Sequence, residues 1–342
     1  MVSIYDIAKE VGLSASTVSL VLSGRGEKMR ISRETERLIL ETANRMGYIP
    51  NMSARKLRTS KARHIPEIAL CWSPTQHSLF LNTFINVLQD MISSGEVREM
   101  RFIILPYKNG ELEKLESILI TNYFNGIVVP PVFQEDIDFL KKTNIQVPVV
   151  ALFGDIDQYN LVSVDNRKVG KEVAEIFHRH GHHRVGIMQS EEKKPALSVE
   201  QRRSSFLNTC QAFKMEAEEI RGNLPGPVHN KVEEGKILAE KMIKDNDIPT
   251  ALFIQNDLLA IGAISVFSEQ GINIPEDMEI IVYGVNDMLE INNPPITSIS
   301  YPTGEISREC ILLMDKALNR PGTKPVRKII DTRYVFRESC LY

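Results

Sequence analysis

The sequence predicts a small all-α head followed by a larger α/β body. Apolar residues recur at helical spacing over the first fifty residues, whereas from Glu67 onward short apolar runs alternate with helical segments. Residues 1–63 contain twelve Lys or Arg and six Asp or Glu, so they carry +6 of a net −3 and leave −9 on the remainder. A basic head on an acidic body is typical of a separate phosphate-binding module.

Composition limits the class of protein. A chain of 342 residues with 43% hydrophobic and 25% charged residues can bury a large core in two or three domains. No apolar run reaches the length of a membrane span, and charges lie close to Met1, so we expect no membrane segment, no secretory signal and a cytoplasmic protein. The cysteines form no CxxC pair, which argues against a zinc site and a disulfide scaffold: Cys71, Cys210, Cys310 and Cys340.

The first helix is predicted to begin after Ser3, whose spacing with Asp6 gives a variant capping box. Its apolar face consists of Ile4, Ile7, Ala8 and Val11. Gly12 suits the left-handed turn that ends such a helix, and Ser14 can cap the next one. The result is a helix, a glycine-containing turn and a second helix.

The second helix is predicted to run to about Ser23. Its inward side chains are Val18, Val21 and Leu22, and its outward ones are Ala15, Ser16, Ser19 and Leu20. This is the spacing of a DNA-reading helix-turn-helix, because a helix with a small, hydroxylated outer face fits a major groove. The alternative is a small helical bundle with a serine-rich surface. A third helix is predicted from Ser32 to Gly47, with apolar residues Ile39, Leu40, Ala43 and Met46.

A short helix is predicted after Pro50, capped by Asn51 and reaching Leu57 and Arg58. It has few apolar groups and could not fold stably alone. An ordinary basic linker helix is the alternative. The predicted domains are therefore a head at residues 1–50, a short helix with its linker at residues 51–66, and a body at residues 67–342.

In the body, the alternation of apolar runs and helical segments predicts a doubly wound α/β architecture. Eight apolar runs are predicted to be buried parallel strands: residues 67–72, 101–105, 126–130, 147–153, 161–165, 184–188, 250–255 and 279–284. Helices are predicted between or after them at residues 80–92, 171–181, 258–271 and 304–318. Ligands of such sheets bind at the carboxyl ends of the strands.

Motifs of other functions are missing. The sequence has no G-x-x-x-x-G-K-[ST] loop, no G-x-G-x-x-G opening a helix after a strand, and no G-x-S-x-G elbow. The HRHGHHR run contains His178 and His182 at helical spacing, but Gly181 is predicted to end the helix between them. We therefore expect no metal, no cofactor and no catalytic site.

Two strings, IYDIAKEVGLSASTVSLVLSG and GYIPNMSARKLR, resemble the DNA-binding headpiece of the LacI/GalR family of bacterial transcription regulators. The resemblance continues along nearly the whole chain. It implies that base-reading positions are held by Ala15, Ser16 and Leu20, and phosphate-facing positions by Tyr5, Ser14, Thr17, Ser19 and Ser23.

Two features of the head depart from the family pattern. Many members have Arg at the position of Leu20, where it can grip guanine with a contact of about 1–3 kcal/mol, whereas Leu20 can only touch a thymine methyl. The loop Gly24–Arg30 is also longer than in typical members. Its Arg25, Lys28 and Arg30 either contact phosphates or form a solvated loop.

The resemblance makes the segment after Pro50 a hinge helix that pairs with its twin across a dimer and enters the minor groove. Leu57 then matches the side chain that wedges into a base step, while Asn51, Arg55 and Arg58 belong to the same DNA-binding segment.

In the body, the resemblance implies two lobes joined by three crossovers, as in periplasmic sugar-binding proteins, with an effector between them. The implied effector-binding positions are Ser73, Phe80, Phe153, Arg202, Asn256 and Asn286. Any one of these could instead be a strand-end residue satisfied locally. Many sugar-responsive members have Asp where this chain has Phe153 and Asn286, so a planar or anionic ligand fits as well as a sugar. Asp165 is predicted to be structural.

The predicted function is a DNA-binding transcriptional regulator, with a repressor as the expected type, that binds a pseudo-palindromic double-stranded operator as a homodimer. A small-molecule effector, a sugar or another metabolite, would control it. The C-terminal RYVFRESCLY has no heptads, which favours a dimer. One alternative is a solute-binding protein of periplasmic type; the other, an α/β enzyme, has no catalytic constellation to support it.

Overall fold

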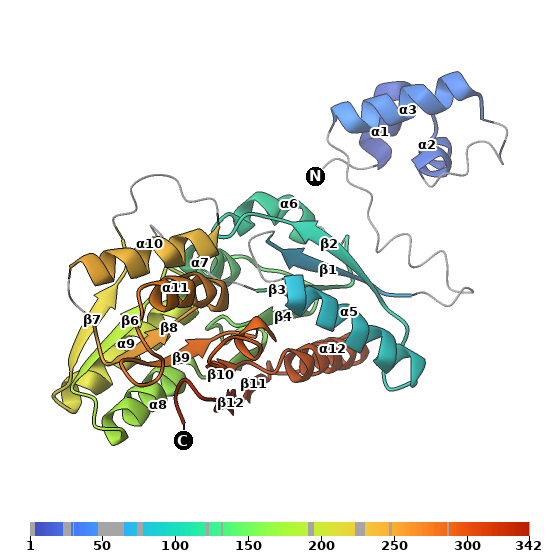
Figure 1. Cartoon of the computed structure of the whole chain (residues 1–342). Helices are drawn as coiled ribbons and strands as arrows, with labels where there is room; N and C mark the ends of the chain where they lie inside the picture. Colours follow the sequence, from blue (N-terminus) through green and yellow to red (C-terminus); the bar gives the residue numbers. More distant parts are fainter. Residues whose placement is uncertain are drawn as a thin grey trace.

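A computed structural model describes residues 4–22, 29, 31–46, 65–73, 78–120, 123–130, 133–190, 195–222, 230–245, 248–285 and 287–341. These residues form a three-helix head and a body of two α/β lobes (Figure 1). Seven of the predicted site residues lie outside the described residues: Ser23, Arg25, Asn51, Arg55, Leu57, Arg58 and Asn286.

The head consists of α1 (Ile4–Val11), α2 (Ala15–Leu22) and α3 (Arg33–Arg45). Gly12 adopts a φ of 69°, as its place after α1 predicted. The Ser14 and Ser32 hydroxyls cap α2 and α3 by accepting hydrogen bonds from the backbone N–H groups of Thr17 and Thr35 at 3.1 and 3.2 Å. The buried core is Ile7, Ala8, Val18, Val21, Ile39 and Ala43.

Leu40 corrects the predicted apolar face of the third helix. Its side chain is 45% exposed, because it follows Ile39 directly and therefore lies about 100° around the helix from that buried residue. Met46, in contrast, packs against the head core as predicted.

The N-terminal lobe contains a six-stranded, all-parallel sheet in the order β11-β5-β4-β3-β1-β2. Residues of α5 and α12 pack on one face of this sheet, and residues of α7 and the segment around α6 pack on the other. The elements are β1 (Glu67–Trp72), α5 (Ser78–Ser93), β2 (Arg101–Pro106), η2 (Leu112–Leu115), α6 (Glu116–Leu119), β3 (Gly126–Val129), α7 (Gln134–Lys142), β4 (Val149–Leu152), β5 (Asn160–Val164), α12 (Thr303–Asn319) and β11 (Arg327–Ile330).

The C-terminal lobe contains a second six-stranded sheet in the order β12-β10-β9-β8-β6-β7, in which only β12 is antiparallel to its neighbour. Helices α10 and α11 cover one face, and α8 and α9 cover the other. The elements are α8 (Asn166–Arg179), β6 (Arg184–Met188), α9 (Leu197–Ala212), β7 (Glu216–Ile220), α10 (Lys231–Lys244), β8 (Ala251–Ile254), α11 (Asp257–Glu269), β9 (Glu279–Tyr283), η3 (Asp287–Leu289), β10 (Thr297–Ser300) and β12 (Arg333–Val335).

The chain passes between the lobes three times, from β5 to α8, from β10 to α12, and from β11 to β12. The two-lobe body with three crossovers is therefore as predicted. Helix α12 lies against α5 and the N-terminal sheet, so the segment after β10 does return to the N-terminal lobe (Figure 1).

Several strands differ from the sequence prediction. β2 was expected to be buried, but it is an edge strand, and Ile103 and Ile104 are 37% and 47% exposed. β7 was not predicted because its sequence, EAEEI, is acidic and suits only the opposite edge position. The sequence does not predict β10, β11 or β12, because none of these strands contains more than two consecutive apolar residues.

Close helix pairs in the C-terminal lobe depend on glycine. A Cβ atom at Gly170 of α8 would lie 2.1 Å from the carbonyl oxygen of Arg202 in α9. Gly235 of α10 and Gly262 of α11 face each other's helices in the same way, at 2.0 and 1.9 Å from the carbonyl oxygens of Leu259 and Val232. These contacts fix where α9, and with it Arg202, lies against α8.

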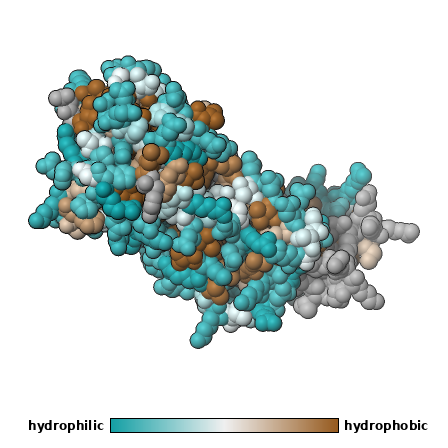
Figure 2. Space-filling view, turned by 60° about the horizontal axis from the view of Figure 1, so that its bottom comes forward, coloured by the Kyte–Doolittle hydropathy of each residue, from teal (hydrophilic) through white to brown (hydrophobic). Residues whose placement is uncertain are grey.

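The surface is mixed. On the face drawn in Figure 2, hydrophobic residues are scattered among hydrophilic ones. Within the described part of the chain, no helix has both the length and the apolar character needed to cross a bilayer.

Candidate functional site

The outer face of α2 is accessible to solvent. Ser14 and Ser16 are exposed, and Thr17, Ser19 and Leu20 are partly exposed, so these predicted DNA contacts remain available at the surface. Tyr5, on α1, is 77% exposed. Ala15 differs from its neighbours, because it also packs against the head core. Its methyl group therefore lies at the edge of the reading face.

Two hydroxyls on this face already have local partners. Ser14 Oγ accepts the Thr17 backbone N–H, and it also lies 2.8 Å from Thr17 Oγ1. Both hydroxyls sit at the N-terminus of α2, where the helix dipole and free N–H groups favour a phosphate. Their predicted phosphate contact is compatible with this cap, since each oxygen can take part in more than one hydrogen bond.

A second constellation lies at the carboxyl ends of strands from both lobes. Trp72 ends β1 and Phe153 follows β4 in the N-terminal lobe, whereas Gln189, Gln255 and Tyr301 follow β6, β8 and β10 in the C-terminal lobe. This is where open α/β sheets bind ligands.

Arg202 is the centre of the C-terminal side. Its side chain is 3% exposed, and its guanidinium carbon lies 3.8 Å from the centroid of the Tyr283 ring. Its Nε donates to Gln255 Oε1 at 3.1 Å, and its Nη1 donates to Asn166 Oδ1 at 2.5 Å. Gln255 in turn donates to Gln189 Oε1 at 2.8 Å. Burial lowers the pKa of Arg202.

This arrangement leaves a buried charge with neutral partners. Among the described residues, the groups that accept hydrogen bonds from Arg202 are amides, and the charged-group influences on its pKa come from tyrosines rather than carboxylates. A buried cation without a counter-charge is costly, so the site is electrostatically suited to an anion.

Aromatic rings connect this cation to the N-terminal lobe. Trp72 stacks on Phe80 with ring centroids 5.5 Å apart, and Phe80 meets Phe153 edge-on at 5.6 Å. Phe153 then contacts Tyr301 at 5.5 Å, and Tyr301 lies 5.9 Å from Tyr283. Burial raises the pKa values of Tyr283 and Tyr301, so both rings stay neutral hydroxyl-bearing surfaces at physiological pH.

Phe153 is also held in an uncommon backbone conformation. Its φ of 63° lies in the left-handed region that side chains other than glycine rarely adopt. Its N–H donates to Val162 O at 3.0 Å, which anchors the residue at the strand end. Backbone strain of this kind clusters at ligand-binding positions.

The structure describes five of the six effector candidates, and three of these belong to one connected constellation. Phe80, Phe153 and Arg202 belong to the connected constellation. Asn256 instead caps α11 through a 3.0 Å hydrogen bond from the Leu259 N–H, and Asp165 caps α8 through one from Lys168, as a structural role predicts. Ser73, which follows β1, is 1% exposed.

Sequence reasoning missed six members of the constellation: Trp72, Asn166, Gln189, Gln255, Tyr283 and Tyr301. All of them except Asn166 lie at or directly after the carboxyl end of a strand. The rule that ligands bind at the carboxyl ends of parallel strands points to these five positions, whereas matching to family positions does not.

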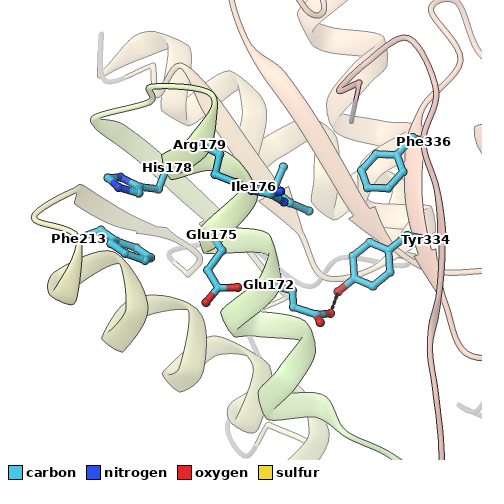
Figure 3. Close-up of a pocket in the computed structure, with 8 residues that line it drawn as sticks. All are labelled: Glu172, Glu175, Ile176, His178, Arg179, Phe213, Tyr334 and Phe336. Carbon is cyan, nitrogen blue, oxygen red and sulfur yellow. Dashed lines mark hydrogen bonds between the residues drawn. The ribbon is translucent and has the colours of Figure 1, made fainter.

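A separate pocket of about 580 Å³ lies on the outer side of α8 (Figure 3). The Tyr334 hydroxyl donates to Glu172 at 2.5 Å on one side, and His178 stacks on Phe213 on the other. None of the predicted effector positions lines this pocket. It is thus distinct from the constellation around Arg202.

A helix-turn-helix head joined to a two-lobed α/β domain with a charged site at its strand ends defines a class: ligand-responsive DNA-binding regulators. Comparison with known proteins agrees. Residues 3–51 match the family described as bacterial regulatory proteins, lacI family, and residues 174–340 match the periplasmic binding protein-like domain.

Relatives match over nearly the whole chain. The probable HTH-type transcriptional repressor ExuR of Bacillus subtilis is 28% identical over 347 residues, covering 99% of this chain and 98% of the relative. Catabolite control protein A of Priestia megaterium is 24% identical over 344 residues, covering 99% of each. The chain belongs to the LacI family, and it is a LacI-type transcriptional regulator with an effector-binding domain.

Solved structures share the fold. A LacI family transcription regulator from Clostridium acetobutylicum matches with a TM-score of 0.71 and 26% identity, covering 80% of this chain and 99% of that one. The lac repressor dimer bound to operator and the anti-inducer ONPF matches with a TM-score of 0.67 and 18% identity, covering 100% and 99%.

Proposed function

We propose that this regulator is a homodimeric repressor that binds a pseudo-palindromic operator and is controlled by an effector held between its lobes. The observation that carries the proposal is the buried Arg202 constellation, which joins the two lobes of a domain attached to a DNA-reading head. An effector that prefers one lobe arrangement can change DNA affinity by its differential affinity for the two arrangements.

On DNA, α2 of each subunit enters the major groove, and Ser16 and Leu20 face base edges. Without an Arg at position 20, the affinity relies on phosphate contacts and on the bending imposed by the segment at residues 51–66, with its Leu57, Arg55 and Arg58. That segment and Ser23 and Arg25 remain predictions.

Exposed apolar side chains support the proposed dimer. Leu79 and Ile85 on α5 are 44% and 47% exposed, and Met288 and Ile291 in the C-terminal lobe are 49% and 74% exposed. Each lobe thus offers apolar surface to a second copy of the chain, which would bring two heads to the two halves of one operator.

The effector is proposed to carry an acidic group, as a sugar acid or sugar phosphate does. Such a group would form charge-assisted hydrogen bonds with the remaining N–H groups of Arg202. The aromatic side chains of Phe80, Phe153, Tyr301 and Tyr283 would pack against the apolar face of the same molecule.

The test of DNA binding uses the full chain and labelled DNA fragments from its own gene neighbourhood. We expect specific binding whose logarithm falls linearly with the logarithm of salt concentration, because phosphate contacts release counterions. Ser16→Asp, which puts a negative charge on the reading face, should weaken binding by about tenfold or more. Leu40→Asp is the matched control, since it adds the same charge to an exposed position of α3.

Equal loss in both variants would show that head charge alone matters and that α2 is not the reading helix. Absence of specific binding by the wild-type chain at low salt would contradict the proposed function. Increased expression of the neighbouring gene after deletion of this one is expected for a repressor, and decreased expression would indicate an activator.

A further inference from the structure

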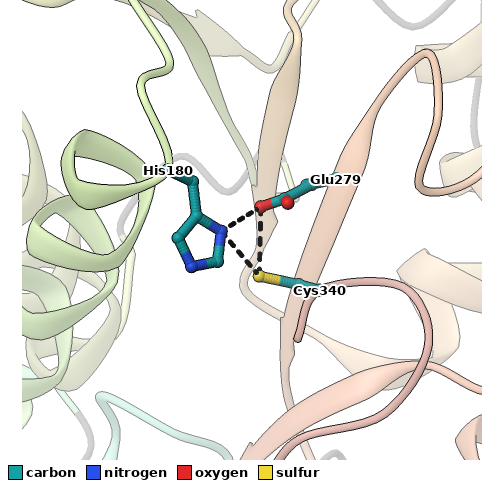
Figure 4. A group of neighbouring side chains, drawn as sticks. All are labelled: His180, Glu279 and Cys340. Atoms are coloured by element: carbon teal, nitrogen blue, oxygen red, sulfur yellow. Dashed lines mark hydrogen bonds and ion pairs between the residues drawn. The ribbon is translucent and has the colours of Figure 1, made fainter. Parts of the chain in front are cut away.

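Three chemically reactive side chains from distant parts of the sequence meet at the N-terminal end of β9 in the C-terminal lobe (Figure 4). His180 follows the last residue of α8, Glu279 begins β9, and Cys340 lies near the C-terminus. His180 Nδ1 is 2.8 Å from Glu279 Oε2, Cys340 Sγ is 3.2 Å from the same oxygen, and Sγ and Nδ1 are 4.0 Å apart. The group is separate from the Arg202 constellation and from the pocket beside α8.

These separations match those of ligands that share one tetrahedral zinc ion. With Zn–N and Zn–O bonds near 2.0–2.1 Å and a Zn–S bond near 2.3 Å, pairs of ligand atoms are roughly 3.3–3.7 Å apart. The three observed distances lie on both sides of that range. Shifts of a few tenths of an ångström would therefore bring all three atoms to bonding distance of one ion.

His182 places a second imidazole beside the same carboxylate. The Thr250 hydroxyl donates to Arg184 O at 3.1 Å, so its oxygen is free to accept the Nδ1–H of His182 at 2.9 Å. The other ring nitrogen, Nε2, lies 3.2 Å from Glu279 Oε2, so His182 helps to hold this carboxylate in place.

The cysteine is held in place before any ion arrives. The Thr297 hydroxyl lies 2.7 Å from Cys340 O, and the neighbouring Ser339 donates to Ile280 O at 2.7 Å and accepts the Thr297 N–H at 2.8 Å. Cys340 is fully buried, whereas the His180, His182 and Glu279 side chains are 15–23% exposed. The cysteine side of the cluster is thus fixed by hydrogen bonds and shielded from solvent, whereas the histidine and glutamate side is accessible to solvent.

We propose that His180, Glu279 and Cys340 bind one Zn²⁺ ion. A thiolate, an imidazole and a carboxylate form a ligand set that favours zinc over calcium or magnesium, which prefer oxygen alone. The Thr250–His182 hydrogen bond orients the second imidazole beside Glu279, in the way that outer contacts orient zinc ligands. On binding, the Cys340 thiol proton leaves to solvent, and the ion ties the C-terminal segment to β9 and to the turn after α8.

The sequence predicts no metal site in this part of the chain. The predicted absence of metal rested on the lack of a CxxC pair and on the helical spacing of His178 and His182. Gly181, with a φ of 82°, does end the helix before His182, and His178 stacks on Phe213 instead. The partners of His180 and His182 lie in β9 and at the chain end, where no spacing rule could associate them.

The test uses the full-length protein after chelator treatment and dialysis. Zn²⁺ is titrated by calorimetry, and Co²⁺ is titrated as a spectroscopic probe, because a cobalt–thiolate bond produces a charge-transfer absorption. We expect one ion per chain. Cys340→Ser should abolish the charge-transfer band, and Cys340→Ser and His180→Ala should each weaken zinc binding by about 100-fold or more. Circular dichroism of each variant verifies that it is folded.

His178→Ala and His183→Ala are the matched controls, since both residues are exposed members of the same histidine-rich run and lie outside the cluster. They should change the zinc affinity by less than about threefold. The proposal is overturned if the wild-type chain binds no zinc, if the cobalt complex has no thiolate band, or if the control variants lose as much affinity as Cys340→Ser and His180→Ala.

Discussion

The two sides of the interlobe site are built from different chemistry. On the N-terminal side, Trp72 and Phe80 are 7% and 2% exposed, Trp72 stacks on Phe80, and Phe80 contacts the Phe153 ring edge-on. On the C-terminal side, Arg202 is equally buried but is held by amides and by the face of Tyr283. Trp72, Phe80 and Arg202 are thus buried to a similar extent. Burial of the two aromatic rings stabilises the fold, whereas burial of the guanidinium charge does not.

The difference indicates separate roles. Aromatic packing stabilises the N-terminal lobe whether or not a ligand is bound, whereas the buried guanidinium gains its full set of partners only when an acceptor arrives. Groups that cost stability in the free protein are expected where a ligand binds. Substitutions on the two sides should therefore separate the packing role from the ligand-binding role.

The largest contrast is expected between Phe80→Ala and Arg202→Met. Phe80→Ala should lower the free energy of unfolding by about 3–5 kcal/mol, because it leaves a cavity beneath Trp72 and Phe153. Arg202→Met should change it by no more than about 1 kcal/mol, because relief of the buried charge offsets the loss of two hydrogen bonds. Thermal unfolding of both variants beside the wild type measures this, and a larger loss for Arg202→Met would reverse the comparison.

A smaller effect is expected from Gly170→Ala. The new methyl group would meet the Arg202 carbonyl oxygen, so α8 and α9 must separate, at a cost of about 1–3 kcal/mol. Gly304→Ala is the matched control, since nothing lies within 4 Å of a Cβ there and helical Gly→Ala replacement stabilises by up to about 1 kcal/mol. Equal melting temperatures for the two variants would show that the α8–α9 contact is not tight.

The smallest effect is expected at Asn256. Asn256→Ala removes the cap of α11 and should cost about 1 kcal/mol, while Asn256→Asp keeps an acceptor for the Leu259 N–H and should cost less. Melting temperatures of the two variants measure the cap. If Asn256→Asp is as unstable as Asn256→Ala, the side chain has a role other than capping.

The sequence predicted most of the fold, because the long amphipathic helices and the buried strands have unambiguous periodicity. It could not predict β7, whose acidic residues are tolerated only at a sheet edge, or β12, whose position depends on the return of the chain after β11. In the site, family positions found Phe80, Phe153 and Arg202. They missed Asn166, Gln189 and Gln255, because a buried amide network is specified by three-dimensional contact rather than by local pattern.

The most direct test of the account compares wild type and Arg202→Met against a panel of sugars, sugar acids, sugar phosphates and nucleobases. Thermal shift identifies the compounds that bind, and the DNA affinity is then measured with and without each one. The account predicts that an acidic compound raises the melting temperature of the wild type but not of Arg202→Met, and changes only the wild-type DNA affinity, by about 5–150-fold. A compound that changes the DNA affinity of both proteins equally would contradict it.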